Sequence, residues 1–128
     1  MDAKYSYKNL DAYKEAKNLV MMVYQLLKQF PKEETYALCD QLRRAVISVP
    51  SNLAEGTGRF STKEQIHFYE ISYGSLMEVE CQMDIAHDLG YISNENLATI
   101  EKQIRIVAAL LSGIRNKRMG EDKTSTSC

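Results

Sequence analysis

Two short segments of the chain pair a carboxylate with a histidine three residues later: Glu64 with His67, and Asp84 with His87. On a helix this spacing places both side chains on one face, as in the di-iron carboxylate four-helix bundles, where the two pairs lie on different helices. Here both pairs fall on one predicted helix, twenty residues or about 30 Å apart. Glu64 also fits the acid of a capping box that begins at Ser61. We therefore predict no metal site and no cofactor.

The cysteines and the paired glycines offer no clearer catalytic chemistry. Cys39 and Cys81 lie in apolar sequence surroundings, which predicts small core or near-core side chains instead of reactive thiolates. Neither histidine has an evident cysteine partner on its own helix face. The segment Gly56-Thr57-Gly58-Arg59 lacks the rest of a phosphate-binding P-loop and follows a helix instead of a strand. The sequence therefore does not predict an enzyme.

The composition indicates a single domain without a strong preference for polyanions. The chain has 128 residues, of which 45% are hydrophobic and 26% charged, and its net charge is −1. These values are typical of a soluble globular domain. The three cysteines show no C-x-x-C spacing, and neither a signal peptide nor an apolar stretch of membrane-spanning length is evident. We expect a reducing, cytoplasmic location and no membrane partner.

Apolar residues recur at three-and-four spacing in four segments, which predicts helices at about 7–29, 33–57, 62–89 and 94–118. The second helix would end where Gly56 and Gly58 offer left-handed exits. No segment alternates with a period of two and the connections are short, so we predict an all-α, antiparallel up-down-up-down four-helix bundle over residues 1–118. The polar segment 119–128 would be a disordered tail. The inward seam of the first helix would consist of Leu10, Tyr13, Lys17, Val20, Tyr24 and Leu27.

Pro50 lies well inside the second predicted helix, where it cannot donate a hydrogen bond to the carbonyl of Val46. The helix must bend there, or break and restart with Ser48 as a cap. Apolar spacing continues in phase from Val49 to Leu53, so we expect a continuous helix kinked at Pro50. We hypothesise that such a kink widens one end of the bundle and suits a ring of protomers.

Two adjacent arginines, Arg43 and Arg44, flank the core seam of the second helix. They could bind phosphate or contact another subunit. The alternative is an ion pair inside the assembly, for which the candidate carboxylates are Glu55, Glu70 and Glu78.

Further basic side chains could reach a nucleic acid. Arg59 follows the two glycines and Lys63 comes one turn later. A second group lies near the end of the fourth helix and comprises Lys102, Arg105, Arg115, Lys117 and Arg118. This strip either contacts phosphates or is a solvated helix face with cations favourably placed near a helix C-terminus.

The third predicted helix is apolar on two faces. One face carries Tyr69, Tyr73 and Leu76, and the face beside it carries Phe68, Ser72, Ser75 and Val79. A helix with two apolar sides in a small bundle usually has a second partner, which favours self-association. The alternative is that both faces belong to the core of the protomer.

Residues 41–60 combine an arginine pair, a proline inside an amphipathic run and a glycine-rich exit. Together with the segments GSL (74–76) and IAHDLGYI (85–92), they resemble the bacterial four-helix-bundle proteins of 23S rRNA intervening sequences, whose relatives include the accessory proteins of diversity-generating retroelements. The resemblance covers about residues 7–118. It implies a homopentamer in which Pro50, Glu55, Gly56 and Gly58 are structural. The retroelement relatives further imply contact with RNA or DNA and with a reverse transcriptase.

Those relatives are strongly basic, whereas this chain has a pI near 6.1. We therefore expect weak, non-specific nucleic-acid contact at most. The function that these observations favour is a non-catalytic, oligomeric four-helix-bundle scaffold. The alternative is a protein-only adaptor that binds no nucleic acid.

Overall fold

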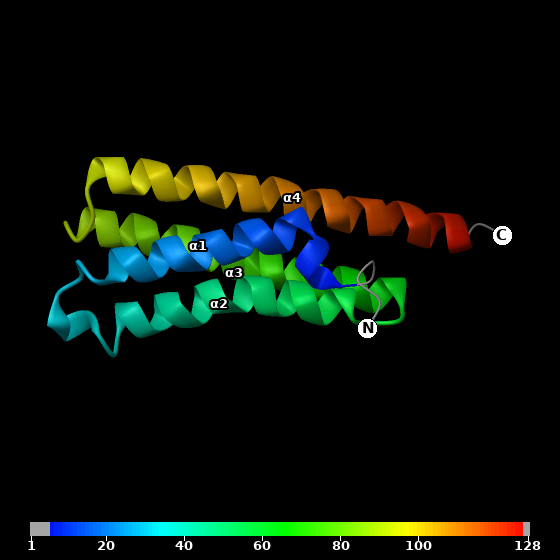
Figure 1. Cartoon of the computed structure of the whole chain (residues 1–128), viewed down its shortest axis with the longest axis horizontal. Helices are drawn as coiled ribbons and strands as arrows, with labels where there is room; N and C mark the ends of the chain where they lie inside the picture. The colour runs from blue at the N-terminus through cyan, green and yellow to red at the C-terminus, as the bar shows by residue number, and fades with distance from the viewer. Residues whose placement is uncertain (1–5, 127–128) are drawn as a thin grey trace.

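The computed structural model describes the backbone of residues 6–126 and the side chains of residues 6–121. Within this range the chain forms four α-helices: α1 (Asp11–Leu27), α2 (Leu38–Thr57), α3 (Thr62–Asp88) and α4 (Asn94–Thr126). Two short 3-10 helices, η2 (Tyr7–Asn9) and η3 (Lys32–Glu34), precede α1 and α2. The four long helices lie side by side as a bundle (Figure 1). The predicted all-α fold is thus confirmed.

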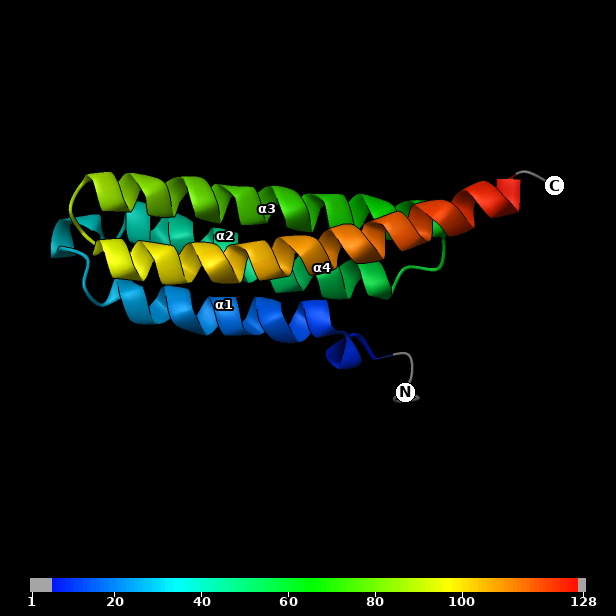
Figure 2. The ribbon, with the colours of Figure 1, turned by 90° about the horizontal axis from the view of Figure 1, so that it is seen from above.

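Each helix packs against its neighbours in the chain, and α1 closes the bundle by packing against α4. No described Cα atom of α1 lies within 8 Å of a Cα atom of α3. These two helices therefore lie diagonally across the bundle, and their outer surfaces face in opposite directions (Figure 2). Short connections between consecutive antiparallel helices account for this arrangement.

Aliphatic side chains from all four helices fill the centre of the bundle. The fully buried ones include Leu19 and Val23 of α1, Leu42, Val46, Val49 and Leu53 of α2, Leu76, Val79 and Met83 of α3, and Ile100, Ile104, Val107 and Leu111 of α4. Full burial of one such side chain stabilises the fold by about 1.5–3 kcal/mol before the entropic cost of folding is counted. No helix in the described part of the chain is both long and apolar enough to cross a membrane.

The seam predicted for the first helix is shifted by one residue over most of its length, although its last member, Leu27, is buried as expected. The structure buries Ala12, Ala16, Leu19, Val23 and Leu26, each one position before a residue of the predicted seam. One residue is about 100° of helix rotation. The observed phase keeps the Lys17 ammonium in solvent and leaves the Tyr24 ring partly exposed. Burying an unpaired lysine would cost far more than burying an alanine gains.

Three helix boundaries also differ from the prediction. The chain enters α1 and α2 through 3-10 turns, so these helices begin at Asp11 and Leu38 instead of near residues 7 and 33. At the other end, α4 continues to Thr126 instead of ending near residue 118. The predicted disordered tail is thus helical over residues 119–126, whereas Ser127 and Cys128 lie outside the described residues. An ion pair between Arg118 and Glu121, with 2.6 Å between Nη1 and Oε2, spans the predicted end of the helix.

Gly56 and Gly58 do not provide the left-handed exits that the sequence suggested. Gly58 caps α2 with φ −82°, in the right-handed region. Gly56 lies buried inside α2, and in the described residues the positive-φ glycine is Gly90, with φ 82° after α3. Gly56 instead allows a close approach between α2 and α3, because a Cβ added there would lie 3.0 Å from Cε1 of Tyr69.

Helix α2 is continuous through Pro50, which is buried, whereas the kink itself stays a prediction. Polar side chains contact the α2 backbone carbonyls just before the proline. Ser72 of α3 donates to the carbonyl of Val49 at 2.6 Å, and Asn52 Nδ2 donates to the carbonyl of Ser48 at 2.9 Å. These bonds add partners for α2 carbonyls beside a residue that cannot donate within the helix.

Candidate functional site

The residues first considered for metal or nucleophile chemistry do not assemble into a reactive cluster. In the described part of the chain, no group of three or more potential ligands is placed to hold a metal ion. The Glu64 amide donates to Ser61 Oγ at 3.0 Å, as one half of the predicted capping box. His87 Nε2 lies 2.6 Å from Asn94 Oδ1, which ties the end of α3 to the start of α4. This histidine therefore has a structural contact.

The two described cysteines have opposite environments. Cys39 is buried, and burial raises the pKa of its thiol. Cys81 is exposed on α3, so the prediction of a core or near-core position is wrong for this residue. Its place on the outer face of α3 follows from the rotation of that helix, which turns Val79 and Met83 inward instead.

The arginines predicted to contact a partner are largely engaged within the protomer. Arg43 Nη2 donates to the carbonyl of Thr35 at 2.9 Å. Arg44 pairs with Asp40 one turn earlier, with 3.2 Å between Nε and Oδ2. Neither arginine pairs with Glu55, Glu70 or Glu78 as the pairing alternative proposed. Arg44 is on the surface, where such a pair adds little stability.

Arg59 has two contacts next to the end of α2. Its Nη2 lies 2.9 Å from Glu55 Oε2, and its guanidinium carbon lies 4.7 Å from the centre of the Phe68 ring. Glu55 thus holds Arg59 against α3. The structural role expected of Glu55 stays a prediction, because both side chains of this pair are largely exposed.

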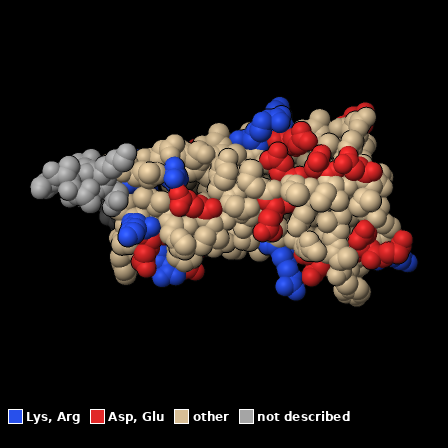
Figure 3. All heavy atoms as spheres, turned by 180° about the vertical axis from the view of Figure 1, so that it is seen from behind, with Lys and Arg blue, Asp and Glu red and all other residues tan. Residues whose placement is uncertain are grey.

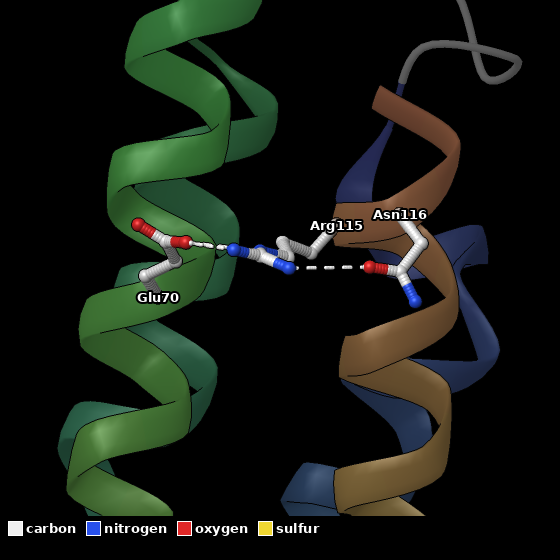
Figure 4. Close-up of polar contacts among 3 residues, drawn as sticks. All are labelled: Glu70, Arg115 and Asn116. Atoms are coloured by element: carbon white, nitrogen blue, oxygen red, sulfur yellow. Dashed lines mark hydrogen bonds and ion pairs between the residues drawn. The ribbon is translucent and has the colours of Figure 1, made fainter. Parts of the chain in front are cut away.

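The basic strip of α4 is partly neutralised. Arg115 reaches across to α3, where its Nε and Nη2 lie 2.9 and 2.6 Å from Glu70 Oε2, while Nη1 donates to Asn116 (Figure 4). Arg105 is 4.0 Å from Glu101, and Arg118 pairs with Glu121.

The lysines of the predicted site are less constrained than its arginines. Lys63, Lys102 and Lys117 are exposed. None of the three has an ion pair with another described residue. Of the predicted set, these lysines are thus the members without a carboxylate partner among the described residues, whereas the arginines have one or more polar contacts within the protomer.

Most of the two apolar faces of the third helix packs inside the protomer, whereas Tyr73 is 37% exposed. Ser72 and Val79 are fully buried, as are Leu76 and Tyr69. The Tyr69 hydroxyl lies 3.0 Å from Thr57 Oγ1 of α2. The two faces contact α2 and α4, so core packing explains the apolar pattern that the sequence suggested for a second partner.

An apolar surface that sequence reasoning missed is centred on Met21 of α1. Its side chain is 71% exposed, the largest exposed fraction among the apolar residues of α1. Two grooves flank it. The first lies between α1 and α2, has a volume of about 450 Å³, and is lined by Tyr7, Tyr13, Lys17, Asn18, Val20, Met21, Ile47, Pro50, Ser51 and Ala54.

The second groove lies between α1 and α4 and has a volume of about 440 Å³; it is lined by Met21, Met22, Gln25, Leu26, Asn96, Thr99 and Ile100. Among the described residues, Lys17 is the only charged one that lines either groove. We name this region, Met21 with its two grooves, the α1 face. The sequence signal for it was the spacing of Ala12, Ala16, Leu19 and Val23, which would have placed Met21 outward.

The opposite side of the molecule is acidic. Helix α3 carries six carboxylates and one lysine: Glu64, Glu70, Glu78, Glu80, Asp84 and Asp88 against Lys63. Seen from behind, acidic side chains gather on the half of the surface away from the C-terminus (Figure 3). Exposed apolar side chains, Ile71 at 38% and Ile85 at 45%, interrupt this acidic surface.

A family model described as 23S rRNA-intervening sequence protein matches residues 8–113. The chain belongs to this family. The match extends from η2 into α4 and includes Pro50, Glu55, Gly56 and Gly58. It ends before Arg115, Lys117 and Arg118, so three of the five residues of the basic strip lie beyond the part that matches the family.

Solved structures share the fold. One of them is a protein of unknown function from the S23 ribosomal protein family of Bacteroides thetaiotaomicron, with a TM-score of 0.75 and 19% sequence identity. The superposition covers 81% of this chain and 97% of that one. Comparison with curated proteins gives no match. The solved structure thus shares the four-helix architecture. The function of the present chain has to be inferred from the surface of its bundle.

Proposed function

We propose that the protein is a non-catalytic scaffold that works as a homo-oligomer of four-helix bundles, with five copies as the family resemblance implies. The observation that carries this proposal is the α1 face. A methionine that is 71% exposed between two nearly uncharged grooves is costly to leave in water. Contiguous apolar surface of this kind is typical of protein–protein contacts.

The surroundings of the α1 face favour protein over a small ligand. Both grooves are shallow depressions along a helix, and their polar lining consists of amides and hydroxyls spread over three helices. Small-molecule sites instead enclose most of the ligand and direct a few polar groups at it. A second copy of the chain supplies a long helix, and a helix fits a groove between two helices.

Light scattering coupled to gel filtration at micromolar concentration tests the proposal. We expect a mass near five times the 14.6 kDa of the chain. A mass near 14.6 kDa across the accessible concentration range would refute self-association.

A weak contact with RNA or DNA is a second candidate function. It is favoured by Lys63, Lys102 and Lys117, which have no carboxylate partner among the described residues. Lysine is a point charge that contacts phosphate without reading base sequence. Because the net charge is −1, we propose that this contact is non-specific and confined to low salt. We place both functions in the cytoplasm, where the free thiols of Cys39 and Cys81 stay reduced.

A further inference from the structure

The outer surface of α1 carries a regular stripe of charge and apolar side chains. Lys14, Met21 and Lys28 follow one another at seven-residue spacing, which returns to nearly the same face of a helix after two turns. All three side chains are exposed. Neither lysine has an ion pair with another described residue, although Lys28 Nζ donates to Gln25 at 3.2 Å. This stripe, the α1 stripe, reads lysine, methionine, lysine.

The outer surface of α3 carries the opposite charges at the same spacing. Glu64, Ile71, Glu78 and Ile85 follow one another at seven-residue intervals, and all four are exposed. Neither glutamate has an ion pair within the described residues. Gly74 lies on the same side, where a Cβ would meet nothing within 4 Å. The first three residues, the α3 stripe, read glutamate, isoleucine, glutamate.

We propose that the α1 stripe of one copy docks on the α3 stripe of the next copy, an inference that rests on the proposed self-association. The apolar centre of each stripe, Met21 or Ile71, would meet the other. The charges two helical turns away on either side would then be opposite in sign: Lys14 and Lys28 against Glu64 and Glu78. Each stripe has the same charge on both sides of its apolar centre. Opposite charges therefore meet whether the two helices run parallel or antiparallel.

The bundle places the two stripes so that the contact can repeat. Because α1 and α3 lie diagonally, on opposite sides of the bundle (Figure 2), and the residues of both stripes are exposed, one copy can present both stripes at once. Two different surfaces meeting in this way form a heterologous contact, which generates a ring when the rotation closes. Pairing of charges also opposes the contact of α1 with α1 or of α3 with α3, because like charges would then face each other.

Charge reversal tests the pairing directly. The first variant, Lys14→Glu with Lys28→Glu, makes both outer surfaces acidic. The second variant, Glu64→Lys with Glu78→Lys, makes both basic. We expect each variant alone to associate about a hundredfold more weakly than the wild type, because like charges would be brought together. Mixing the two should restore association in part, since a contact between unlike variants joins an acidic surface to a basic one, although a closed ring of five must keep at least one contact between like variants.

A chain with all four substitutions should also associate, because its two stripes are again opposite in sign. The matched control is Lys102→Glu with Lys117→Glu, which makes the same change in net charge on α4 and should keep the wild-type mass. Circular dichroism checks that each variant is folded, which we expect because the substituted residues are exposed.

The outcomes separate this inference from the proposed function. A monomeric wild type would refute self-association itself. An oligomeric wild type whose two charge-reversed variants keep their mass would overturn only the pairing of the stripes. Dissociation of both variants without recovery in the mixture or in the fourfold variant would also overturn it, since the loss would then not come from complementary charge.

Discussion

Gly56 of α2 lies directly against Phe68 of α3: a side-chain carbon on Gly56 would be 2.9 Å from the Phe68 Cβ and 3.2 Å from the carbonyl oxygen of Gln65. Carbon atoms in ordinary contact are at least about 3.5 Å apart. Because two of the opposing atoms belong to or adjoin the backbone of α3, the two helices can only relieve this contact by separating. The closeness of α2 and α3 at this end of the bundle thus depends on a glycine.

The substitution Gly56→Ala should therefore destabilise the fold, by about 1–3 kcal/mol as expected for overpacking. Urea unfolding followed by circular dichroism measures the change. Gly74→Ala is the matched control, because its new methyl group meets nothing within 4 Å and alanine favours a helix interior by about 0.5–1 kcal/mol. If Gly56→Ala were as stable as Gly74→Ala, the close approach would have no energetic role.

Replacement of Met21 with glutamate should weaken self-association by at least about tenfold, because a charge would have to be desolvated in the contact. Ile106→Glu on α4 is the control. Ile106 is 36% exposed and lies outside the α1 face. Gel filtration with light scattering compares the two. Equal masses for both variants would exclude the α1 face from the assembly.

Pro50 gives a test of the link between helix shape and assembly. Pro50→Ala restores an amide that can donate to the carbonyl of Val46, and a proline inside a helix costs about 3 kcal/mol. The loss of the buried ring offsets part of this gain. We expect a protomer more stable by about 1 kcal/mol and an altered oligomer mass. If stability and mass both equal those of the wild type, Pro50 has no role in the assembly.

Binding to a short RNA should depend on the lysines more than on the arginines. We expect Lys102→Ala with Lys117→Ala to weaken binding at low salt about equally for unrelated sequences, and to reduce its salt dependence. Arg115→Ala should change binding less, because Arg115 is engaged with Glu70. Fluorescence anisotropy measures both. Failure of the wild type to bind at low salt would leave the protein-only scaffold.

The carboxyl group of Glu15 should make the free energy of unfolding depend on pH in the acidic range. Hydrogen bonds from the side chains of Gln103 and Asn18 lower the pKa of its carboxyl group below the ordinary value. A carboxyl with a lowered folded-state pKa contributes stability above its unfolded pKa, about 4.3 for glutamate, and loses it as pH falls through the folded pKa. Glu15→Gln should thus reduce stability near neutral pH, and the loss should disappear as pH falls through the lowered folded-state pKa of Glu15. A difference from the wild type that is independent of pH would contradict this assignment.

Helix-forming segments and their order were predictable because their signals are local. Apolar spacing, the capping box at Ser61 and the prolines lie within a few residues of the features that they specify. The choice of the buried face of α1 was not predictable. A shift of one residue turns that face by about 100° but preserves most of the apolar pattern. Only the packing of Ala12 and Ala16 against neighbouring helices decides it.

The sequence by itself determined four helices, their antiparallel order and the family of the chain, because these depend on periodicity and on short motifs. The tertiary structure decided which charges are available. Arg115 meets Glu70 only because α3 and α4 are neighbours, with 45 residues between the partners. The tertiary structure also decided that Met21 and Ile71 are exposed on opposite sides of the bundle. The direction of a side chain depends on how each helix is rotated relative to the others.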